Sequence, residues 1–189
     1  MTLSRREFVR TAAAIGASLA WAGPARAARA KWRERRDLYP EGVASGDPAP
    51  DSVILWTRRP FETGTRQLLT VELAEDEAFR KVVARAPAAV SAAADWTCRV
   101  LVGGLKPART YWYRFTDSEG NGSRIGRTIT APARDDPRPV AFAFVSCQDV
   151  NEGKLNAYRR MIFEDERADP ATVAADLLSQ AEHDSSAQV

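Results

Sequence analysis

The sequence predicts a mainly β protein, in which a β-sandwich over residues 38–132 is followed by the first strand and helix of an α/β domain. Three observations support this prediction. Short stretches of alternating apolar and polar residues recur between turn-forming residues, as in sandwiches. The stretch 131–139 holds three prolines and four charges, which is typical of a domain boundary. After it the pattern changes to a continuous apolar run and then to helical spacing.

The N-terminus has the features of an export signal. Arg5 and Arg6 stand in "SRREFV", an apolar run covers Thr11–Ala22, and Ala25-Arg26-Ala27 provides a small-x-small cleavage site. The paired arginines resemble the twin-arginine signal, which implies that residues 1–27 direct export through the twin-arginine translocon. An ordinary secretory signal or an uncleaved anchor is the alternative. The apolar run is shorter than the roughly 20 residues that span a bilayer, so we expect no stable membrane span after cleavage.

The net charge argues against a nucleic-acid-binding protein. The whole chain has 27 Lys and Arg against 25 Asp and Glu. Cleavage after Ala27 removes four of the basic residues and one acidic residue, so the mature chain has 23 against 24 and a net charge of −1. No basic footprint for nucleic acid then remains. The locally basic Lys31–Arg36 falls in a linker, 28–37, that we expect to be a solvated tether.

The first half of the sandwich contains three predicted strands. A turn through Gly46-Asp47-Pro48 precedes a strand at Ser52–Arg58. The stretches 67–76 and 79–86 follow as the next two strands. The positions of the first strand that alternate onto one face are Val53, Leu55 and Thr57.

A fourth strand follows within "DWTCRVLV". Trp96, Cys98 and Val100 alternate onto one of its faces, which makes Cys98 a small buried hydrophobe. The chain has a second cysteine, Cys147, and an exported protein enters an oxidising compartment, so a disulfide between the two is the alternative.

An aromatic strand then suggests which kind of sandwich this is. The run "GLKPARTYWYRF" is typical of fibronectin type III-like domains, where a Leu-x-Pro turn leads into a Tyr-rich strand. Tyr111, Tyr113 and Phe115 alternate along it, and we expect them in the core. Gly120-Asn121-Gly122 predicts a tight reversal before the last strand. The sequence therefore predicts an immunoglobulin/fibronectin III-like β-sandwich.

Residues 140–168 predict the start of an α/β domain, connected by a linker at 133–139. Val140–Val145 is a continuous apolar run, as expected for a strand that is buried on both faces. A helix is expected in "KLNAYRRMIFEDERA", with these apolar residues at helical spacing: Leu155, Tyr158 and Ile162. Functional side chains of α/β domains gather at the carboxyl ends of strands, and Cys147 lies there.

Three stretches together resemble the PhoD-like alkaline phosphatases. They are "YPEGVASGDPAPDSVILWTR", the aromatic run above and "FVSCQDVNEGKLNAYRRMIFEDERA", and the similarity covers about Leu38 to Ala168. The resemblance implies a hydrolase of phosphate esters that is exported to the periplasm or beyond. It implies a small N-terminal β-sandwich in front of a calcineurin-like metallophosphoesterase core. It also implies an iron and calcium centre, in which Cys147 of the Ser-Cys-Gln motif is an iron ligand.

The chain departs from this family after Ala168. The later motifs of the core, a Gly-Asp followed by an aromatic residue and a Gly-Asn-His or Gly-Asn-Asp turn, are absent from the sequence. The one Gly-Asp pair, Gly46-Asp47, belongs to the sandwich, and the one histidine is His183. A multinuclear site cannot be assembled from a single thiolate. We therefore expect a truncated core and no phosphatase activity from this chain alone.

The tail, residues 169–189, carries a second resemblance. Asp169-Pro170 is a good helix start, and a surface helix without a binding role explains the pattern of the tail. "VAADLLSQAEHD" is also similar to a segment of histidinol dehydrogenase, which implies that Gln180 and His183 are zinc ligands. They lie three residues apart, on one face of a helix. A zinc site needs about four ligands and no others are evident, so we do not expect zinc.

Two alternatives to a phosphatase fragment follow from these features. The first is a non-catalytic module of the cell envelope, whose β-sandwich binds a partner or a polymer. The second is a fragment of histidinol dehydrogenase, which would be cytosolic, zinc-dependent and linked to NAD. The export signal argues against the second, and no G-x-G-x-x-G stretch for a dinucleotide is present.

Overall fold

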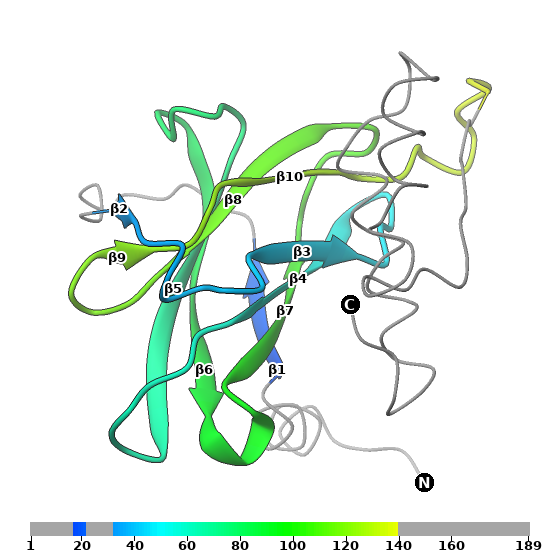
Figure 1. Cartoon of the computed structure of the whole chain (residues 1–189). Coiled ribbons are helices and arrows are strands. Elements are labelled where there is room, and N and C mark those ends of the chain that lie inside the picture. Colours follow the sequence, from blue (N-terminus) through cyan, green and yellow to red (C-terminus); the bar gives the residue numbers. More distant parts are fainter. Residues whose placement is uncertain (1–16, 22–31, 140–189) are drawn as a thin grey trace, which may run out of the picture.

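The strands of the computed structural model form two sheets that pack face to face (Figure 1). The structure describes residues 17–21 and 32–139. One sheet has the order β1-β7-β4-β3, and the other has the order β2-β9-β8-β5-β6, with β10 paired to β8. The strands are β1 (Ala17–Trp21), β2 (Arg33–Glu34), β3 (Val43–Gly46), β4 (Ser52–Arg58), β5 (Arg66–Ala74), β6 (Val82–Ser91), β7 (Thr97–Gly103), β8 (Thr110–Thr116), β9 (Asn121–Gly122) and β10 (Gly126–Ile129).

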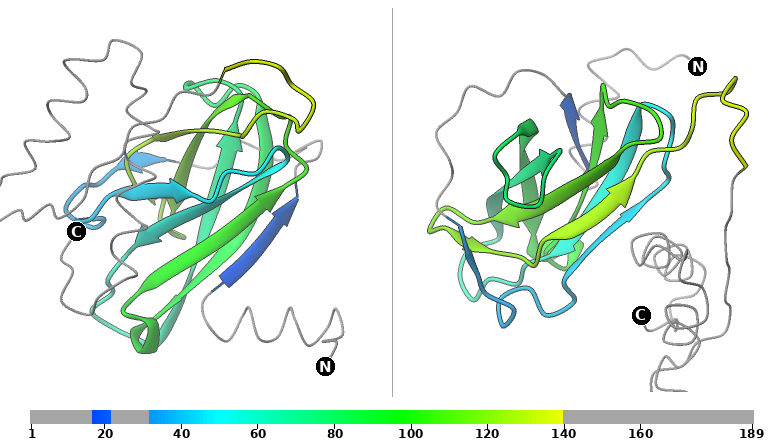
Figure 2. Two further views of the ribbon diagram at one scale, coloured as in Figure 1. Left: turned by 90° about the vertical axis from the view of Figure 1, so that its right-hand side faces the viewer. Right: turned by 90° about the horizontal axis from the view of Figure 1, so that it is seen from above.

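The strand order is that of a fibronectin III-like sandwich with additions at its edges. Strands β3, β4 and β7 form one antiparallel layer, and β10, β8, β5 and β6 form the other. A short 3-10 helix, η1 (Ala92–Ala94), connects β6 to β7. Strand β10 contacts β3 at one side of the sandwich, and β1 contacts both β6 and β7 at the other side. Figure 2 shows the two layers and these flanking strands from two further directions.

The core forms because alternate residues of both layers point inward. In β4, Val53, Leu55 and Thr57 are fully buried while the residues between them are half-buried, so both the bounds and the alternation of this strand are confirmed. The predicted aromatic residues of β8 also lie in the core: Tyr111, Tyr113 and Phe115. The prediction of a mainly β, immunoglobulin/fibronectin III-like sandwich is confirmed.

Two strand predictions were wrong at their ends. The strand expected at 79–86 begins only at Val82 and runs to Ser91, because Phe79 has a φ of 53° and belongs to the preceding loop. Trp96, expected in a strand with Cys98, has a φ of 57° and lies just before β7. Positive φ is rare for bulky residues, so neither break could be expected from the alternation of side chains.

The tight reversal also lies earlier than expected. The turn closes with the Gly120 N–H donating to the Asp117 carbonyl, and Gly120 takes the positive φ of 87°. Asn121 and Gly122 belong to the returning strand β9, and Gly122 pairs with Thr116 of β8. A reversal that contains a glycine was therefore predicted correctly, but it runs from Asp117 to Gly120 and not over Gly120–Gly122.

The basic stretch before the sandwich is not a solvated tether in its described part. Arg33 and Glu34 form β2, which pairs in parallel with Asn121 and Gly122 of β9. The backbone N–H groups of Arg33 and Arg35 donate to the carbonyls of Gly120 and Gly122, each at 2.9 Å. The linker expectation is wrong here because β9 offers a short free edge that the preceding segment fills.

Several predictions fall outside the described residues. They concern the remaining residues of the export signal, the strand and helix expected within 140–168, and the tail at 169–189. Within residues 17–21 and 32–139, no helix has the length and apolar character needed to cross a bilayer.

Candidate functional site: buried charges of the sandwich

The side chains singled out for chemistry by the sequence do not lie in the described part of the chain. These are the signal arginines and the candidate metal ligands: Arg5, Arg6, Cys147, Gln180 and His183. Within residues 17–21 and 32–139, no group of three or more His, Cys, Asp or Glu side chains could hold a metal ion. The described residues therefore do not provide a set of ligands that fits iron, calcium or zinc.

Cys98 is a core residue, as the sequence predicted. It is 1% exposed between the two layers, and burial raises the pKa of its thiol to about 12. Because the thiolate is the reactive form of cysteine, a thiol with this pKa is neither a nucleophile nor a ready metal ligand at neutral pH. It acts as a small apolar side chain.

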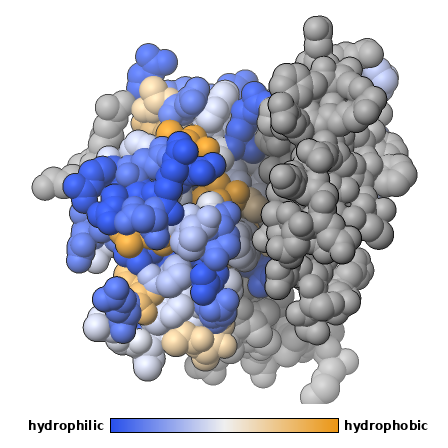
Figure 3. Space-filling view, in the orientation of Figure 1, coloured by the Kyte–Doolittle hydropathy of each residue, from blue (hydrophilic) through white to orange (hydrophobic). Residues whose placement is uncertain are grey.

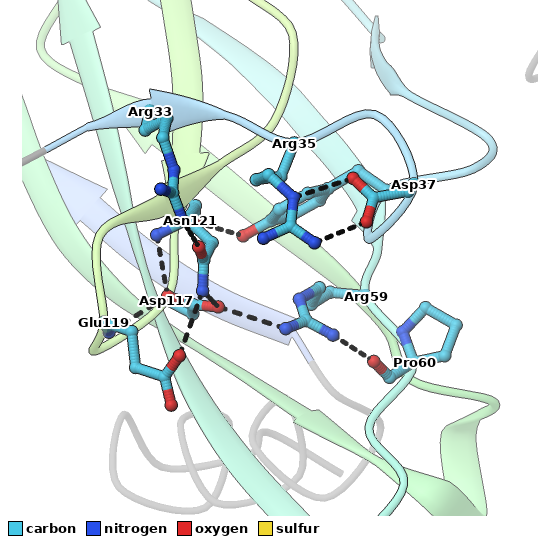
Figure 4. Close-up of polar contacts among 9 residues, drawn as sticks. Arg33, Arg35, Asp37, Arg59, Pro60, Asp117, Glu119 and Asn121 are labelled. Atoms are coloured by element: carbon cyan, nitrogen blue, oxygen red, sulfur yellow. Dashed lines mark hydrogen bonds and ion pairs between the residues drawn. The ribbon is translucent and has the colours of Figure 1, made fainter.

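The first of two buried ion clusters joins the end of β4 to the turn after β8 (Figure 4). Arg59 Nη2 donates to Asp117 Oδ2 at 3.1 Å, and both side chains are almost fully buried. The Asp117 carboxylate also accepts the backbone N–H groups of Glu119 and Asn121, at 3.0 and 2.9 Å, which fixes the conformation of the turn. The Arg59 guanidinium lies 4.1 Å from the centre of the Phe61 ring, so its flat face is covered as well.

The N-terminal segment fastens onto this Arg59–Asp117 cluster. Arg33 Nη2 donates to Asn121 Oδ1 at 3.1 Å, and the buried Tyr39 hydroxyl donates to the Asn121 carbonyl at 3.1 Å. Burial raises the pKa of Tyr39 above its usual range, and the negative charge of Asp117 adds to this rise. Figure 4 shows Arg33 of the N-terminal segment and Asp117 and Glu119 of the turn around Asn121, whereas Arg35 pairs with Asp37. The cluster therefore holds three segments that are distant in the sequence.

The second cluster is centred on Glu72, in the middle of β5. Glu72 is 1% exposed and accepts from two arginines of the neighbouring strands. Arg114 Nε and Nη2 of β8 donate to Glu72 Oε2 at 2.9 and 2.7 Å. Arg85 of β6 donates to Glu72 Oε1, from Nε at 2.9 Å and also from Nη2. Both arginines are register partners of Glu72, so the sheet itself brings the three charges together.

Aromatic rings cover the Glu72 cluster on the outer face of its sheet. The Arg114 guanidinium lies 4.1 Å from the centre of the Phe79 ring and 5.2 Å from that of Trp32. Trp32 can approach because Gly122 has no side chain, since a Cβ there would lie 2.0 Å from the Trp32 ring. The rings keep water away from the ion pairs, which strengthens each pair once it is formed.

Sequence reasoning missed both clusters. A signal for the second was present: Glu72 lies between Val71 and Leu73, and Arg114 lies between Tyr113 and Phe115. Opposite charges in the centres of two apolar strands indicate a cross-strand ion pair. No comparable signal marks the first cluster, because its members come from loops and strand ends.

A hydrogen-bonded corner at the start of β8 shows which kind of sandwich this is. The Tyr111 hydroxyl accepts the Lys106 backbone N–H at 2.9 Å, five residues upstream, at the connection from β7 to β8. Thr130 Oγ1 donates to the Lys106 carbonyl at 2.6 Å, so the end of β10 is tied to the same corner. A tyrosine that bonds back to the backbone in this connection is a hallmark of immunoglobulin-like sandwiches.

The surface shows mainly hydrophilic residues on the face seen in Figure 3, with small apolar patches between them. The exposed large apolar residues of the described part are few and come from different strands: Leu68, Leu101 and Ile129. Scattered apolar residues of this kind are normal on a protein surface.

The strand order and the hydrogen bond of Tyr111 to the Lys106 backbone define a fibronectin III-like β-sandwich domain. The chain belongs to the family of PhoD-like phosphatases: the model of their N-terminal domain matches residues 24–132, more than half of the chain. A second family model, histidinol dehydrogenase, matches residues 159–189 and so concerns only the C-terminal end.

Two relatives of known identity agree with this assignment. Alkaline phosphatase D of Bacillus subtilis (strain 168) is 36% identical over 173 residues, which cover 85% of this chain and 30% of that protein. The solved structure of PhoD superposes with a TM-score of 0.62 at 36% identity, covering 67% of this chain and 26% of the other. The chain thus spans between a quarter and a third of the length of the relatives it matches.

Proposed function

We propose that this chain is the N-terminal part of an exported, metal-dependent hydrolase of phosphate esters, and that the β-sandwich is its non-catalytic domain. The observation that carries the proposal is the extent of the similarity. The match to alkaline phosphatase D covers 85% of the chain, whereas the model of the N-terminal domain ends at residue 132. The similarity therefore extends beyond the sandwich, towards the part in which a catalytic core is expected.

The proposal assigns one role in chemistry to a residue of this chain. Cys147 would be an iron ligand, since a thiolate is a strong ligand for a transition metal and the sequence predicts this residue at the end of a strand. Metal ions in such enzymes hold the phosphate group and stabilise the charge that develops on it. Cys147 lies outside the described residues, and the described residues supply no further ligand set. Because the sequence lacks the later motifs of the core and has one histidine, His183, we propose that the 189 residues by themselves do not hydrolyse phosphate esters.

A chimaera tests the assignment of Cys147 and of the family function. Residues 1–168 of this chain are joined to the part of Bacillus subtilis alkaline phosphatase D that follows its match. We expect this protein to hydrolyse p-nitrophenyl phosphate, a monoester, or bis-p-nitrophenyl phosphate, a diester. Cys147→Ser should lower the activity by more than about 100-fold, because loss of a direct ligand exceeds the roughly 10–100-fold cost of losing an outer partner.

Cys98→Ala is the matched control, because it removes the other cysteine from a buried position in the sandwich. It should cost about 1 kcal/mol of stability and leave the activity unchanged. An active Cys147→Ser chimaera would show that Cys147 is not a ligand. A folded but inactive chimaera with the native cysteine would count against the family function, and turnover by the 189-residue chain alone would contradict the proposed inactivity.

Export is tested separately from catalysis. The leader is fused to a reporter that fluoresces after export only when it crosses the membrane folded. Substituting both Arg5 and Arg6 by lysine should abolish export, whereas Arg10→Lys, a neighbouring arginine outside the pair, should not. Export of the double variant at the normal rate would exclude the twin-arginine route.

A further inference from the structure

Strand β1 occupies the outer edge of β7, although it comes from the segment that the sequence identifies as the leader. Ala17–Trp21 pairs in parallel with Arg99–Gly103, and Leu19 is the register partner of Leu101. The other edge of β7 is paired with β4. β1 also contacts β6, so it closes the side of the sandwich between the two layers. Figures 1 and 2 show β1 alongside β7 in every view.

This strand lies between the two functional parts of the leader. It begins eleven residues after Arg6 and ends four residues before Ala25, the first residue of the cleavage site. Cleavage after Ala27 would remove β1 completely. β7 would then become an edge strand with free N–H and C=O groups, and Leu101, 38% exposed with the leader present, would lose its neighbouring strand.

We propose that the folded sandwich binds its own leader at the outer edge of β7 before export, and that this pairing competes with delivery of the leader to the export machinery. The inference rests on the proposed export of the protein. The occupant of the edge is the leader segment Ala17–Trp21, and no second molecule is required.

Two features of the strands support a reversible pairing. The leader segment is uncharged, so no buried charge opposes its addition to the sheet. The pairing extends over only five residues, and each backbone hydrogen bond adds little net free energy in water. A leader held in this way is shielded from aggregation while it can still be released.

A pair of cysteines tests whether the leader lies on β7 in the purified precursor. Leu19→Cys with Leu101→Cys, in a Cys147→Ser background, places two thiols on register partners of adjacent strands. Such strands lie about 4.8 Å apart, within the range that a disulfide bridges. Cys98 does not compete, because it is buried. Leu19→Cys with Leu68→Cys is the matched control, since Leu68 is exposed on β5 of the opposite sheet.

We expect mild oxidation to cross-link the first pair and not the second. Equal cross-linking of both pairs, or of neither, would overturn the proposal. Cross-links between chains instead of within one chain would also overturn it, because they would show that a second copy occupies the edge.

A substitution on the sandwich tests the competition with export while leaving the leader unchanged. Leu101→Lys places a charge beside the leader strand and should weaken the pairing, whereas Leu68→Lys is the control on the opposite sheet. Amide exchange at residues 17–21 should accelerate on the order of tenfold in Leu101→Lys. Transport of this variant into inverted membrane vesicles should be several-fold faster than that of Leu68→Lys.

Equal exchange and equal transport rates in the two variants would overturn the proposal, and so would faster exchange without faster transport. Failure of every variant, including the native precursor, to enter the vesicles would contradict the proposed export. Because cross-linking and amide exchange are measured on the purified precursor, the pairing itself is tested independently of export.

Discussion

The two buried ion clusters of the sandwich differ in the parts of the fold that they connect. The Glu72 cluster joins three neighbouring strands of one sheet, and the pairing register alone places Arg85 and Arg114 opposite Glu72. The Arg59–Asp117 cluster joins the two sheets instead: it links the end of β4, in one sheet, to the turn after β8 and the N-terminal segment, in the other.

This difference shows how the same kind of contact can have global or local effects. Glu72 lies in the middle of β5, so the strands cannot pair without burying its charge, and its partners are needed for the whole sheet to form. Asp117 organises one turn and the segment that docks on it. Removing Asp117 should loosen this end of the sandwich while the sheets stay paired.

The largest effect is expected from Glu72→Gln. It removes the negative charge that the guanidinium groups of Arg85 and Arg114 share, and Arg114 is buried. Breaking a buried pair in this way costs about 3–5 kcal/mol, which should appear as a lower urea midpoint with exchange accelerated throughout the sandwich. The exposed Glu62→Gln serves as the control and should stay within about 0.5 kcal/mol. If Glu72→Gln lowered the free energy of unfolding by less than about 1 kcal/mol, the Glu72 cluster would not be needed for the whole sheet.

A smaller and local effect is expected from Asp117→Asn. The amide keeps one oxygen acceptor for the turn but loses the charge that pairs with Arg59. We expect a loss of about 2 kcal/mol, typical of hydrogen bonds to a charged group. Hydrogen exchange should accelerate at Arg33–Arg35 and Gly120 more than in β5. Uniform acceleration in all strands would show that this cluster, too, acts on the whole fold.

Gly122→Ala tests the one place where the two clusters meet. The new Cβ would displace the Trp32 ring, which covers Arg114 of one cluster, and would strain β9, which belongs to the other. Overpacking of this kind costs about 1–3 kcal/mol, and tryptophan displacement should shift the fluorescence emission. Gly46→Ala is the control, because its Cβ would meet nothing within 4 Å. Unchanged fluorescence in Gly122→Ala would contradict the packing of Trp32.

Tyr39→Phe is expected to have the smallest effect on the free energy of unfolding at neutral pH. At alkaline pH it tests how strongly the Arg59–Asp117 cluster depends on the buried tyrosine. The pKa of Tyr39 is raised from 10.0 by burial and then by the charge of Asp117. The unfolded chain therefore loses this proton first, so the associated stability is present below about pH 10 and is lost as the pH rises above it. In Tyr39→Phe, the decline of the free energy of unfolding above pH 10 should be shallower by up to about 1.4 kcal/mol per pH unit.

Urea unfolding of the native chain and Tyr39→Phe between pH 8 and 11 measures this difference. Part of the decline should persist in the variant, because burial also raises the pKa of Tyr113 above its usual value and that of Cys98 to about 12. Parallel declines of the two proteins would show that folding does not change the pKa of Tyr39, which would contradict its burial.

Regular alternation made much of the sandwich predictable. Val53 and Leu55 of β4, and Tyr111 and Tyr113 of β8, lie in the core as expected, because each strand follows period two without interruption. The prediction failed where single residues leave the extended conformation. Phe79 adopts a positive φ and turns out of the expected strand onto Arg114, a contact that depends on two other strands.

The candidate site was less predictable than the fold. The assignment of Cys147 follows from a motif and stays a prediction, since the residue lies outside the described part of the chain. The Arg59–Asp117 cluster could not be found, because its members are 58 residues apart and neither belongs to a periodic stretch. Charges in loops leave no pattern in the sequence when only tertiary packing brings them together.

The sequence by itself determined the class of the domain, the faces of its main strands and its membership of the PhoD-like phosphatases, because these depend on local periodicity and on motifs. Only the tertiary structure decided the other features: that the basic N-terminal segment becomes β2, that Glu72 is buried among arginines, and that Ala17–Trp21 pairs with β7. The physical reason is the same for all three. A free strand edge needs a pairing strand, and a buried charge needs a counter-charge. Which segment of the chain provides them depends on which segments the folded structure brings close.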